Sequence, residues 1–498
     1  MNVNPITRLD YPDLDVIRVE DTYYMVSTTM HFMPGCEILQ SFDLVHWEHV
    51  TYVYETLDHT DAQQLKSGQN IYGQGMWAAS LRYHEGRFYI CFVANDTRKT
   101  YLYTSEKIDG PWKKQLIEGF YHDGSLLFDE DGRNYIVYGN DEIWITELNE
   151  DLTAPKKDGL HRLLVSDHKN PELGYKGSHI QKINGYYYIF LIHSLRDRWM
   201  RTEACFYSDS LEGEFTGGDV LCDDRGYCGQ GVAQGGIVDT PDGKWYAMLF
   251  QDSGAVGRIP ILLPVTWKDH FPFFGQNGHV PEEIEVHSTR PGYIYQPLVG
   301  SDDFCNGLLP RWQFNHDPDP RYYHLDALQG TYTITTREVC TELTQAVNTL
   351  TQRMSYPSCA AEVTVDASAL KEGDVAGLCA LQSCYAAVGI TKHHGKYEVL
   401  MLDKKEDGIL DMTEGAVVES HQMDFRLEAD FCNMKDEARC YYRVNKGDWL
   451  PIGTVHKLYF KLDHFTGCRF GLFCYAAEET GGSACFRDFK YYDVDEIS

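Results

Sequence analysis

The chain has 498 residues, with 74 Asp and Glu against 44 Lys and Arg, and its formal net charge is −30. A surplus of this sign disfavours the phosphate backbone of nucleic acids and anionic membrane surfaces as partners. The length is too great for one ordinary core and suits two domains, and 43% hydrophobic residues indicate a globular protein.

The fifteen cysteines show no CxxC pair with zinc spacing. Many are flanked by aromatic residues in strand-like runs, so we interpret about half as small buried hydrophobic residues. The first residues lack the charged and apolar regions of a signal peptide, and no apolar run reaches about 18 residues. We therefore expect a reduced, cytoplasmic protein that neither crosses nor binds a membrane. The sequence predicts no oligomeric state.

A hairpin signature recurs five times in the first part of the chain. An apolar strand leads into an acidic turn and then an aromatic strand, most clearly in residues 121–138. The turns of the other four copies lie in residues 20–24, 85–89, 184–188 and 242–246. Repetition of one supersecondary unit predicts an all-β, five-bladed β-propeller over residues 1–295.

One position is equivalent in all five repeats. It lies twelve residues before the last tyrosine of four hairpins and eleven before that of the first. The first strand of each blade lines the central axis, so these residues should form a ring at one mouth of the channel. Carboxylates that bind hydroxyls and an indole face that stacks on a sugar are typical of a carbohydrate pocket. The ring comprises Asp13, Trp77, Asp123, Lys176 and Gln234.

The second part of the chain follows a proline-rich connector. Five prolines fall between residues 260 and 291, as at a domain boundary. Alternating strands such as residues 330–335, 359–365 and 470–474 then predict a β-sandwich over residues 296–498. We expect this domain to bury a blade face rather than to shape the rim of the pocket.

The first part of the chain carries a set of short motifs. They are Asp13 after Tyr11-Pro12, Phe32-Met33-Pro34-Gly35, Asp43-Leu44-Val45-His46-Trp47, Met76-Trp77-Ala78, Asp123-Gly124-Ser125-Leu126, Gly177-Ser178-His179, Asn184-Gly185-Tyr186-Tyr187-Tyr188 and Gly257-Arg258. Together these motifs resemble glycoside hydrolase family 43, over residues 1 to about 290. The second part carries Asn348-Thr349-Leu350-Thr351-Gln352-Arg353, which resembles the concanavalin-like jelly-roll domain of some family members.

The resemblance implies roles for individual residues. It implies an inverting exo-glycosidase that removes xylose or arabinose from oligosaccharides of plant polysaccharides. In such an enzyme a base activates water and an acid protonates the leaving oxygen. Asp13 matches the base and Asp123 matches a carboxylate that orients the sugar and tunes the acid. The substrate-binding residues implied are Phe32, Trp77, His179, Gln234 and Arg258.

The general acid departs from the family pattern. Lys176 stands where the family has Glu before Gly-(Ser/Pro)-His. A lysine ammonium, with a reference pKa of about 10.4, is a poor proton donor near neutral pH. Glu172 and Glu203 are alternative acids. At the position of Gln234, many relatives carry a histidine that is associated with a calcium ion in the channel. The residues of this chain give no argument for a bound calcium ion, and we expect no cofactor.

The sequence is therefore compatible with two main functions. The leading hypothesis is the glycosidase, whose partner is a small oligosaccharide. The alternative is a catalytically impaired sugar-binding propeller, because Lys176 replaces the acid. A protein-interaction propeller is weaker, since it needs no ring of carboxylates and aromatic residues.

Overall fold

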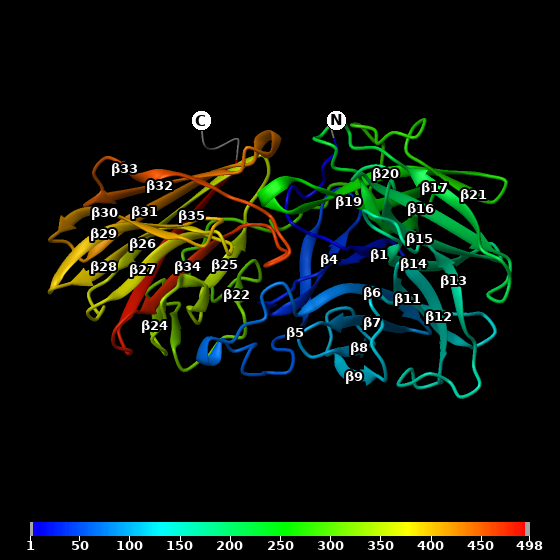
Figure 1. Ribbon diagram of the computed structural model, residues 1–498, viewed down its shortest axis with the longest axis horizontal. Helices are drawn as coiled ribbons and strands as arrows, with labels where there is room; N and C mark the ends of the chain where they lie inside the picture. Colours follow the sequence, from blue (N-terminus) through cyan, green and yellow to red (C-terminus); the bar gives the residue numbers. More distant parts are fainter. Residues whose placement is uncertain (1–2, 494–498) are drawn as a thin grey trace.

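The structure is a computed structural model that describes residues 3–493 (Figure 1). Two β-rich bodies lie side by side, a propeller coloured blue to green and a sandwich coloured yellow to red. The predicted fold class is confirmed. No helix in the described residues is long and apolar enough to cross a membrane. The described helices are single 3₁₀ turns, namely η1 (Lys66–Gly68), η2 (Gly254–Val256), η3 (Leu343–Gln345) and η4 (Cys432–Met434).

Each propeller blade is a four-stranded antiparallel sheet whose strands follow chain order. The predicted hairpins form the two inner strands of every blade. Blades 1 and 2 comprise β1 (Asp15–Val19), β2 (Thr22–Val26), β4 (Gly35–Ser41) and β5 (Glu48–Tyr54), then β6 (Met76–His84), β7 (Arg87–Ala94), β8 (Lys99–Ser105) and β9 (Lys113–Ile117). Blades 3 to 5 comprise β10 (Ser125–Phe128), β11 (Asn134–Asn140), β12 (Glu142–Leu148) and β13 (His161–Ser166), then β14 (Lys176–Ile183), β15 (Tyr186–Ser194), β16 (Arg201–Ser208) and β17 (Thr216–Leu221), then β18 (Ala233–Asp239), β19 (Trp245–Asp252), β20 (Arg258–Lys268) and β21 (Phe271–Phe274).

The innermost strands begin irregularly, which turns their first side chains toward the channel mouth. In blades 2, 4 and 5 the pairing register shifts within the first residues of β6, β14 and β18. Such bulges re-aim side chains beside binding sites. Asp13, Asp123 and Gln234 also adopt left-handed backbone, with φ of 51°, 48° and 61°. A strained conformation of this kind costs about 1–3 kcal/mol per residue and persists where the surroundings enforce it.

The second domain packs two antiparallel sheets face to face. Its buried core includes residues of both sheets, such as Leu378, Phe425 and Phe486. The eight-stranded sheet has the order β3 (Phe32–Met33), β22 (Gln313–Asn315), β25 (Leu350–Arg353), β34 (Arg469–Ala476), β27 (Asp374–Leu381), β28 (Ala386–His393), β29 (Lys396–Lys404) and β30 (Leu410–Val418). The seven-stranded sheet has the order β23 (Tyr323–Asp326), β24 (Thr331–Thr335), β35 (Ser483–Asp493), β26 (Ser358–Asp366), β31 (Gln422–Asp430), β32 (Glu437–Val444) and β33 (Leu450–Lys457).

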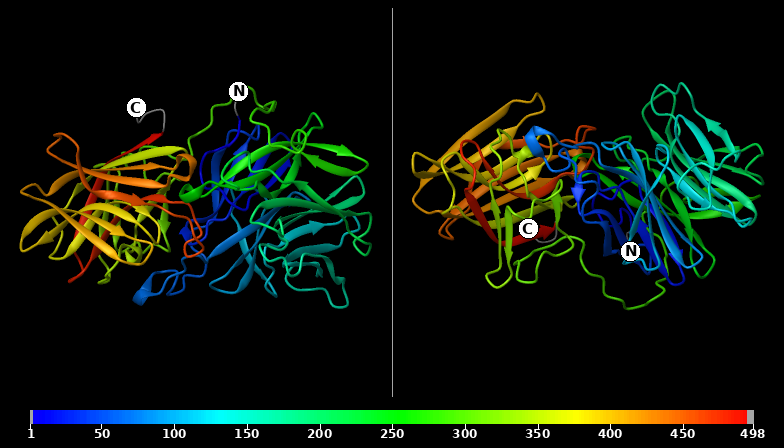
Figure 2. Two further views of the ribbon diagram at one scale, coloured as in Figure 1. Left: turned by 45° about the horizontal axis from the view of Figure 1, so that its top comes forward. Right: turned by 90° about the horizontal axis from the view of Figure 1, so that it is seen from below.

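The two domains share backbone pairing and core. β3 comes from a propeller loop, yet it pairs with β22 at the edge of the eight-stranded sheet. A buried ion pair joins Glu37 of blade 1 to Arg353 of the sandwich, with 2.9 Å between Oε2 and Nη1. Between Phe274 and Gln313 the chain runs along the outside of the molecule (Figure 2). The predicted boundary at residues 295 and 296 lies within this connecting segment.

The cysteines pack as small hydrophobic side chains in most places. All fifteen lie within the described residues and none forms a disulfide bond. Ten of them are buried, including Cys36 in the propeller and Cys379 in the sandwich.

Candidate active site

A cavity of about 670 Å³ opens at the mouth where the innermost strands begin. All five ring residues line it, together with Arg258 at the start of β20. The structure therefore brings together side chains that lie far apart in the sequence, because each blade contributes the start of its first strand. The ring residues are Asp13, Trp77, Asp123, Lys176 and Gln234.

Asp13 is held rigidly at the base of the cavity. Its Oδ1 accepts a hydrogen bond from Arg258 Nη1 at 2.8 Å, and its Oδ2 accepts one from Thr28 Oγ1 at 2.9 Å. Burial raises the pKa of Asp13, Arg258 lowers it, and the nearby Asp123 raises it, with a net increase above the usual value. A fixed carboxylate whose pKa is shifted toward neutrality suits a general base.

Asp123 connects the third blade to the fourth. Its Oδ2 accepts a hydrogen bond from the backbone N–H of Gly177 at 3.1 Å and lies 3.4 Å from His122 Nε2. Gly177 has φ of 65°, and a Cβ there would lie 2.7 Å from the Gln234 side chain. Glycine is required here because the backbone is left-handed and Gln234 packs directly against it.

Lys176 lines the cavity without a partner. Its side chain makes no hydrogen bond and no ion pair within 4.0 Å among residues 3–493. Of the two alternative acids, Glu172 lines the cavity and is exposed, whereas Glu203 is fully buried on β16 and does not line it. Glu203 Oε2 accepts the backbone N–H of Gln234 at 2.7 Å, and burial raises the pKa of Glu203 well above its usual value. Glu203 therefore holds the backbone of Gln234 in place from outside the cavity.

The sandwich domain completes the cavity wall, contrary to our expectation that it would mainly bury a blade face. The loop between β33 and β34 contributes Leu462 and Phe465 to the lining. The Phe465 ring stacks under the Arg258 guanidinium at 4.2 Å and lies 5.7 Å from Trp77. Its carbonyl oxygen also accepts a hydrogen bond from Arg258 at 3.4 Å. The sandwich thus helps to fix the arginine that holds Asp13.

Two implied substrate-binding residues lie away from the cavity, so those predictions are corrected. Phe32 belongs to β3, is buried in the sandwich, and packs 3.4 Å from the Arg469 guanidinium. His179 is buried as well, with Nδ1 3.2 Å from Asp15 Oδ1. Pairing of β3 with the sandwich draws Phe32 outward, and the bulge in β14 turns His179 toward blade 1.

Further lining residues were not identified from the sequence. His122 and Phe120 are close neighbours of Asp123 in the chain, so their position could have been anticipated. Some of the others lie on blade strands, namely Asn140 on β11, Ile192 on β15, Arg201 at the start of β16 and Phe250 on β19. The rest come from loops that carry no repeat signature, and they are Asn95, Arg98, Leu173, Trp199, Leu462 and Phe465.

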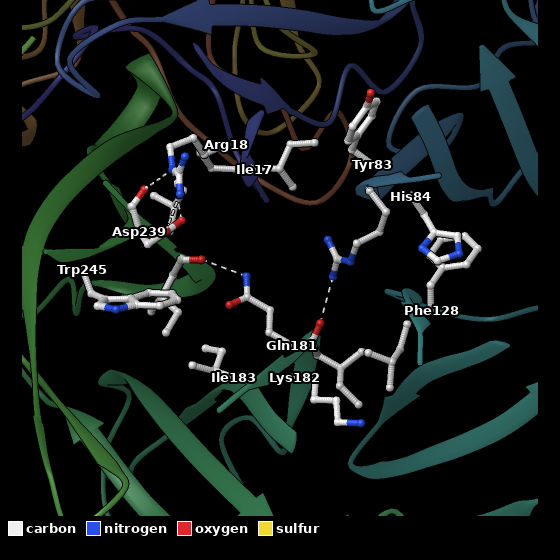
Figure 3. Close-up of a pocket in the computed structure, with 16 residues that line it drawn as sticks. Ile17, Arg18, Tyr83, His84, Phe128, Gln181, Lys182, Ile183, Asp239 and Trp245 are labelled. Atoms are coloured by element: carbon white, nitrogen blue, oxygen red, sulfur yellow. Dashed lines mark hydrogen bonds and ion pairs between the residues drawn. The ribbon is translucent and has the colours of Figure 1, made fainter. Parts of the chain in front are cut away.

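A second cavity, of about 410 Å³, occupies the opposite mouth, where the innermost strands end. Figure 3 shows Gln181 pointing into it, with Arg18 paired to Asp239 across blades 1 and 5. Between the two cavities, Arg82 donates to Asp15 Oδ2 at 2.7 Å and to Ser125 Oγ at 2.7 Å. Although burial raises it, Arg82 and His179 bring the pKa of Asp15 down to about 2. This buried ion pair ties several blades together at the axis.

The residues that the structure describes contain no cluster of three or more His, Cys, Asp or Glu side chains arranged to hold a metal ion. We assign no chemical step to a metal.

Fold and cavity define a class: a five-bladed propeller with paired carboxylates and aromatic walls at one mouth, completed by a β-sandwich. Residues 3–272 match the family described as glycosyl hydrolases family 43, and residues 301–492 match the β-xylosidase C-terminal concanavalin A-like domain. The chain belongs to glycosyl hydrolase family 43 and is a glycoside hydrolase of a family characterised by inversion.

Individual relatives agree with this assignment. A bifunctional GH43-CE protein of Bacteroides eggerthii is 42% identical with a TM-score of 0.93, over 100% of this chain and 64% of that one. A β-xylosidase of Formosa agariphila is 26% identical over 99% of this chain and 89% of its own length. A non-reducing end α-L-arabinofuranosidase of Bacteroides ovatus is 24% identical, over 82% and 79% respectively.

Proposed function

We propose that this protein releases xylose or arabinose from the non-reducing ends of plant-polysaccharide oligosaccharides. The observation that carries the proposal is the position of Asp13, pinned by Arg258 and Thr28 in a cavity whose wall includes Trp77. The names of the relatives support these two sugars.

The cavity residues divide the reaction between them. Asp13 accepts a proton from a water molecule that attacks the anomeric carbon, and Asp123 binds a sugar hydroxyl near Lys176. Trp77 stacks on the apolar face of the ring. Attack from one side with departure on the other inverts the anomeric configuration.

The test compares nitrophenyl β-xyloside, nitrophenyl α-L-arabinofuranoside and a natural xylo-oligosaccharide. We expect release of the free sugar, with the opposite anomer appearing first in the NMR spectrum. Binding of all three substrates without turnover by the native chain would contradict the proposal and favour a sugar-binding propeller.

A further inference from the structure

Five aromatic side chains line the cavity. Trp199 is 43% exposed and lies under the Arg201 guanidinium at 5.4 Å. Phe120 lies under the Arg98 guanidinium at 3.9 Å. Phe250 is only 1% exposed, and the Arg258 guanidinium covers Phe465. If Trp77 stacks on the sugar ring, the exposed Trp199 leaves the cavity a second aromatic surface. The aromatic lining residues are Trp77, Phe120, Trp199, Phe250 and Phe465.

Lys176 differs from the other cations of this wall. Arg258 is paired with Asp13 and Arg201 with Asp252 at 2.6 Å, while Arg98 rests on Phe120. Lys176 alone among these four has no charged or aromatic partner in the described residues. Its ammonium is therefore available to a ligand, at the ring position beside Asp123.

We propose that Lys176 and this aromatic wall select glycosides whose leaving group is a phenol. The inference rests on the hydrolytic function proposed above: the sugar released is the same, but a phenol replaces the oligosaccharide as the preferred leaving group. A phenol has a pKa near 10, as tyrosine does, whereas the pKa of a sugar hydroxyl is closer to water's value of about 15.7. A phenolate can depart unprotonated beside a fixed cation, but a sugar alkoxide needs an acid.

Water is the only co-reactant in the proposed step. The oxygen of water forms a bond to the anomeric carbon, and its proton passes to Asp13. The bond between the anomeric carbon and the phenolic oxygen breaks, and its electron pair stays on that oxygen as a phenolate. The Lys176 ammonium forms an ion pair with this phenolate while the aromatic side chains pack against its ring. Asp13 then returns its proton to solvent.

The experiment measures kcat/KM for substituted phenyl xylosides and arabinofuranosides over a range of phenol pKa, beside xylobiose and xylose 1-phosphate. In the native chain we expect phenyl glycosides to exceed xylobiose by at least about 10³-fold. Lys176→Met should lower kcat/KM for phenyl glycosides by about 10²-fold and steepen its dependence on phenol pKa, since removal of one charge-stabilising group typically costs this much. Lys157→Met, at an exposed site elsewhere in the propeller, is the matched control and should change neither value.

Each contrary outcome has a distinct meaning. Unchanged phenyl glycoside hydrolysis in Lys176→Met, with unchanged thermal unfolding, would overturn the role of the ammonium. Cleavage of xylose 1-phosphate as fast as the phenyl glycosides would overturn selection by the aromatic wall. If the native chain cleaved xylobiose as fast as the phenyl glycosides, the phenol inference would fail and the hydrolytic function would stand. If the native chain turned over no substrate, the hydrolytic function itself would fail.

Discussion

Asp13 is the residue whose geometry is most fully determined. Two hydrogen bonds fix its two oxygens, and the guanidinium of the buried Arg258 makes no ion pair with any other carboxylate among the described residues. We expect Asp13→Asn to lower kcat by at least 10²-fold, a typical contribution of a positioned base. The amide oxygen still accepts from Arg258, so the variant should fold. Rate assays and thermal unfolding test this, and normal turnover in a folded variant would show that the base is misassigned.

Lys176 sets the range of leaving groups. Lys176→Glu places a carboxyl group beside Asp123, where like charge and burial raise the pKa of an acid and favour its protonated form. We expect kcat/KM for xylo-oligosaccharides to rise by about 10²–10⁴-fold, the usual value of one general acid.

Oligosaccharide assays of the native chain provide the counter-test for Lys176→Glu. Efficient cleavage by the native chain would show that another group donates the proton. Glu172→Gln should then be measured first, since Glu172 lines the cavity, and the buried Glu203→Gln is its comparison.

The loop between β33 and β34 is the element that joins the two domains at the cavity. Phe465 contacts both Arg258 and Trp77 from the sandwich side. We expect Phe465→Ala to raise KM about tenfold with a smaller change in kcat, because a stacked aromatic contact is worth about 0.5–1.5 kcal/mol beyond its buried area. Leu328→Ala, at a side chain that is 94% exposed, is the control for truncation alone. Equal KM in both variants would exclude the loop from substrate binding.

The same element shows where prediction from the sequence ends. The ring residues could be predicted because each blade repeats the offset from its hairpin to the start of its first strand. Phe465 could not, since its partner Trp77 belongs to another domain and no repeat relates the two. Phe32 was misplaced for a similar reason: its motif lies in the propeller, but its strand pairs with β22 of the sandwich. The sequence pattern within one repeat is enough to predict a blade, whereas contacts between the domains depend on segments that lie far apart in the chain.

Buried histidines meet at the interface between the two domains. It buries three histidines, His31 from the propeller and His316 and His464 from the sandwich. His31 has ring centroids 4.9 Å and 5.8 Å from the other two, and Tyr72 stacks on His464 at 3.9 Å. His316 Nε2 accepts the backbone N–H of Ile71 at 3.0 Å, so it carries no proton there. Burial and mutual repulsion lower the pKa of His31 and His316 well below the usual value, and burial lowers that of His464 to about 3.

These shifts predict acid destabilisation with a definite sign. A histidine whose pKa falls on folding binds more protons when unfolded, so the stability it confers is lost as pH drops below about 6.5. The loss should be about 1.4 kcal/mol per pH unit for each histidine, down to the folded pKa. Carboxylates with lowered pKa, such as Asp15, act only nearer pH 4 and below. Burial raises the pKa of Asp374 and of Asp436 to about 6, so these two groups bind protons in the folded state within the window from about pH 6.5 to 4.5 and act with the opposite sign. The contribution of a histidine is therefore read from the difference in slope between the native chain and a variant that lacks it.

His464→Phe keeps the stacking on Tyr72 and removes one titrating group. Urea unfolding between pH 6.5 and 4.5 should show a slope smaller by about 1.4 kcal/mol per pH unit than in the native chain. His287→Phe, whose side chain is 64% exposed, should keep the native slope. Equal slopes in all three proteins would mean that protonation of His464 is not linked to unfolding, and this would contradict the prediction. A reduced slope in His464→Phe alone would show that protonation of His464 at the domain interface is linked to unfolding, next to the Phe465 side chain that supplies part of the cavity wall.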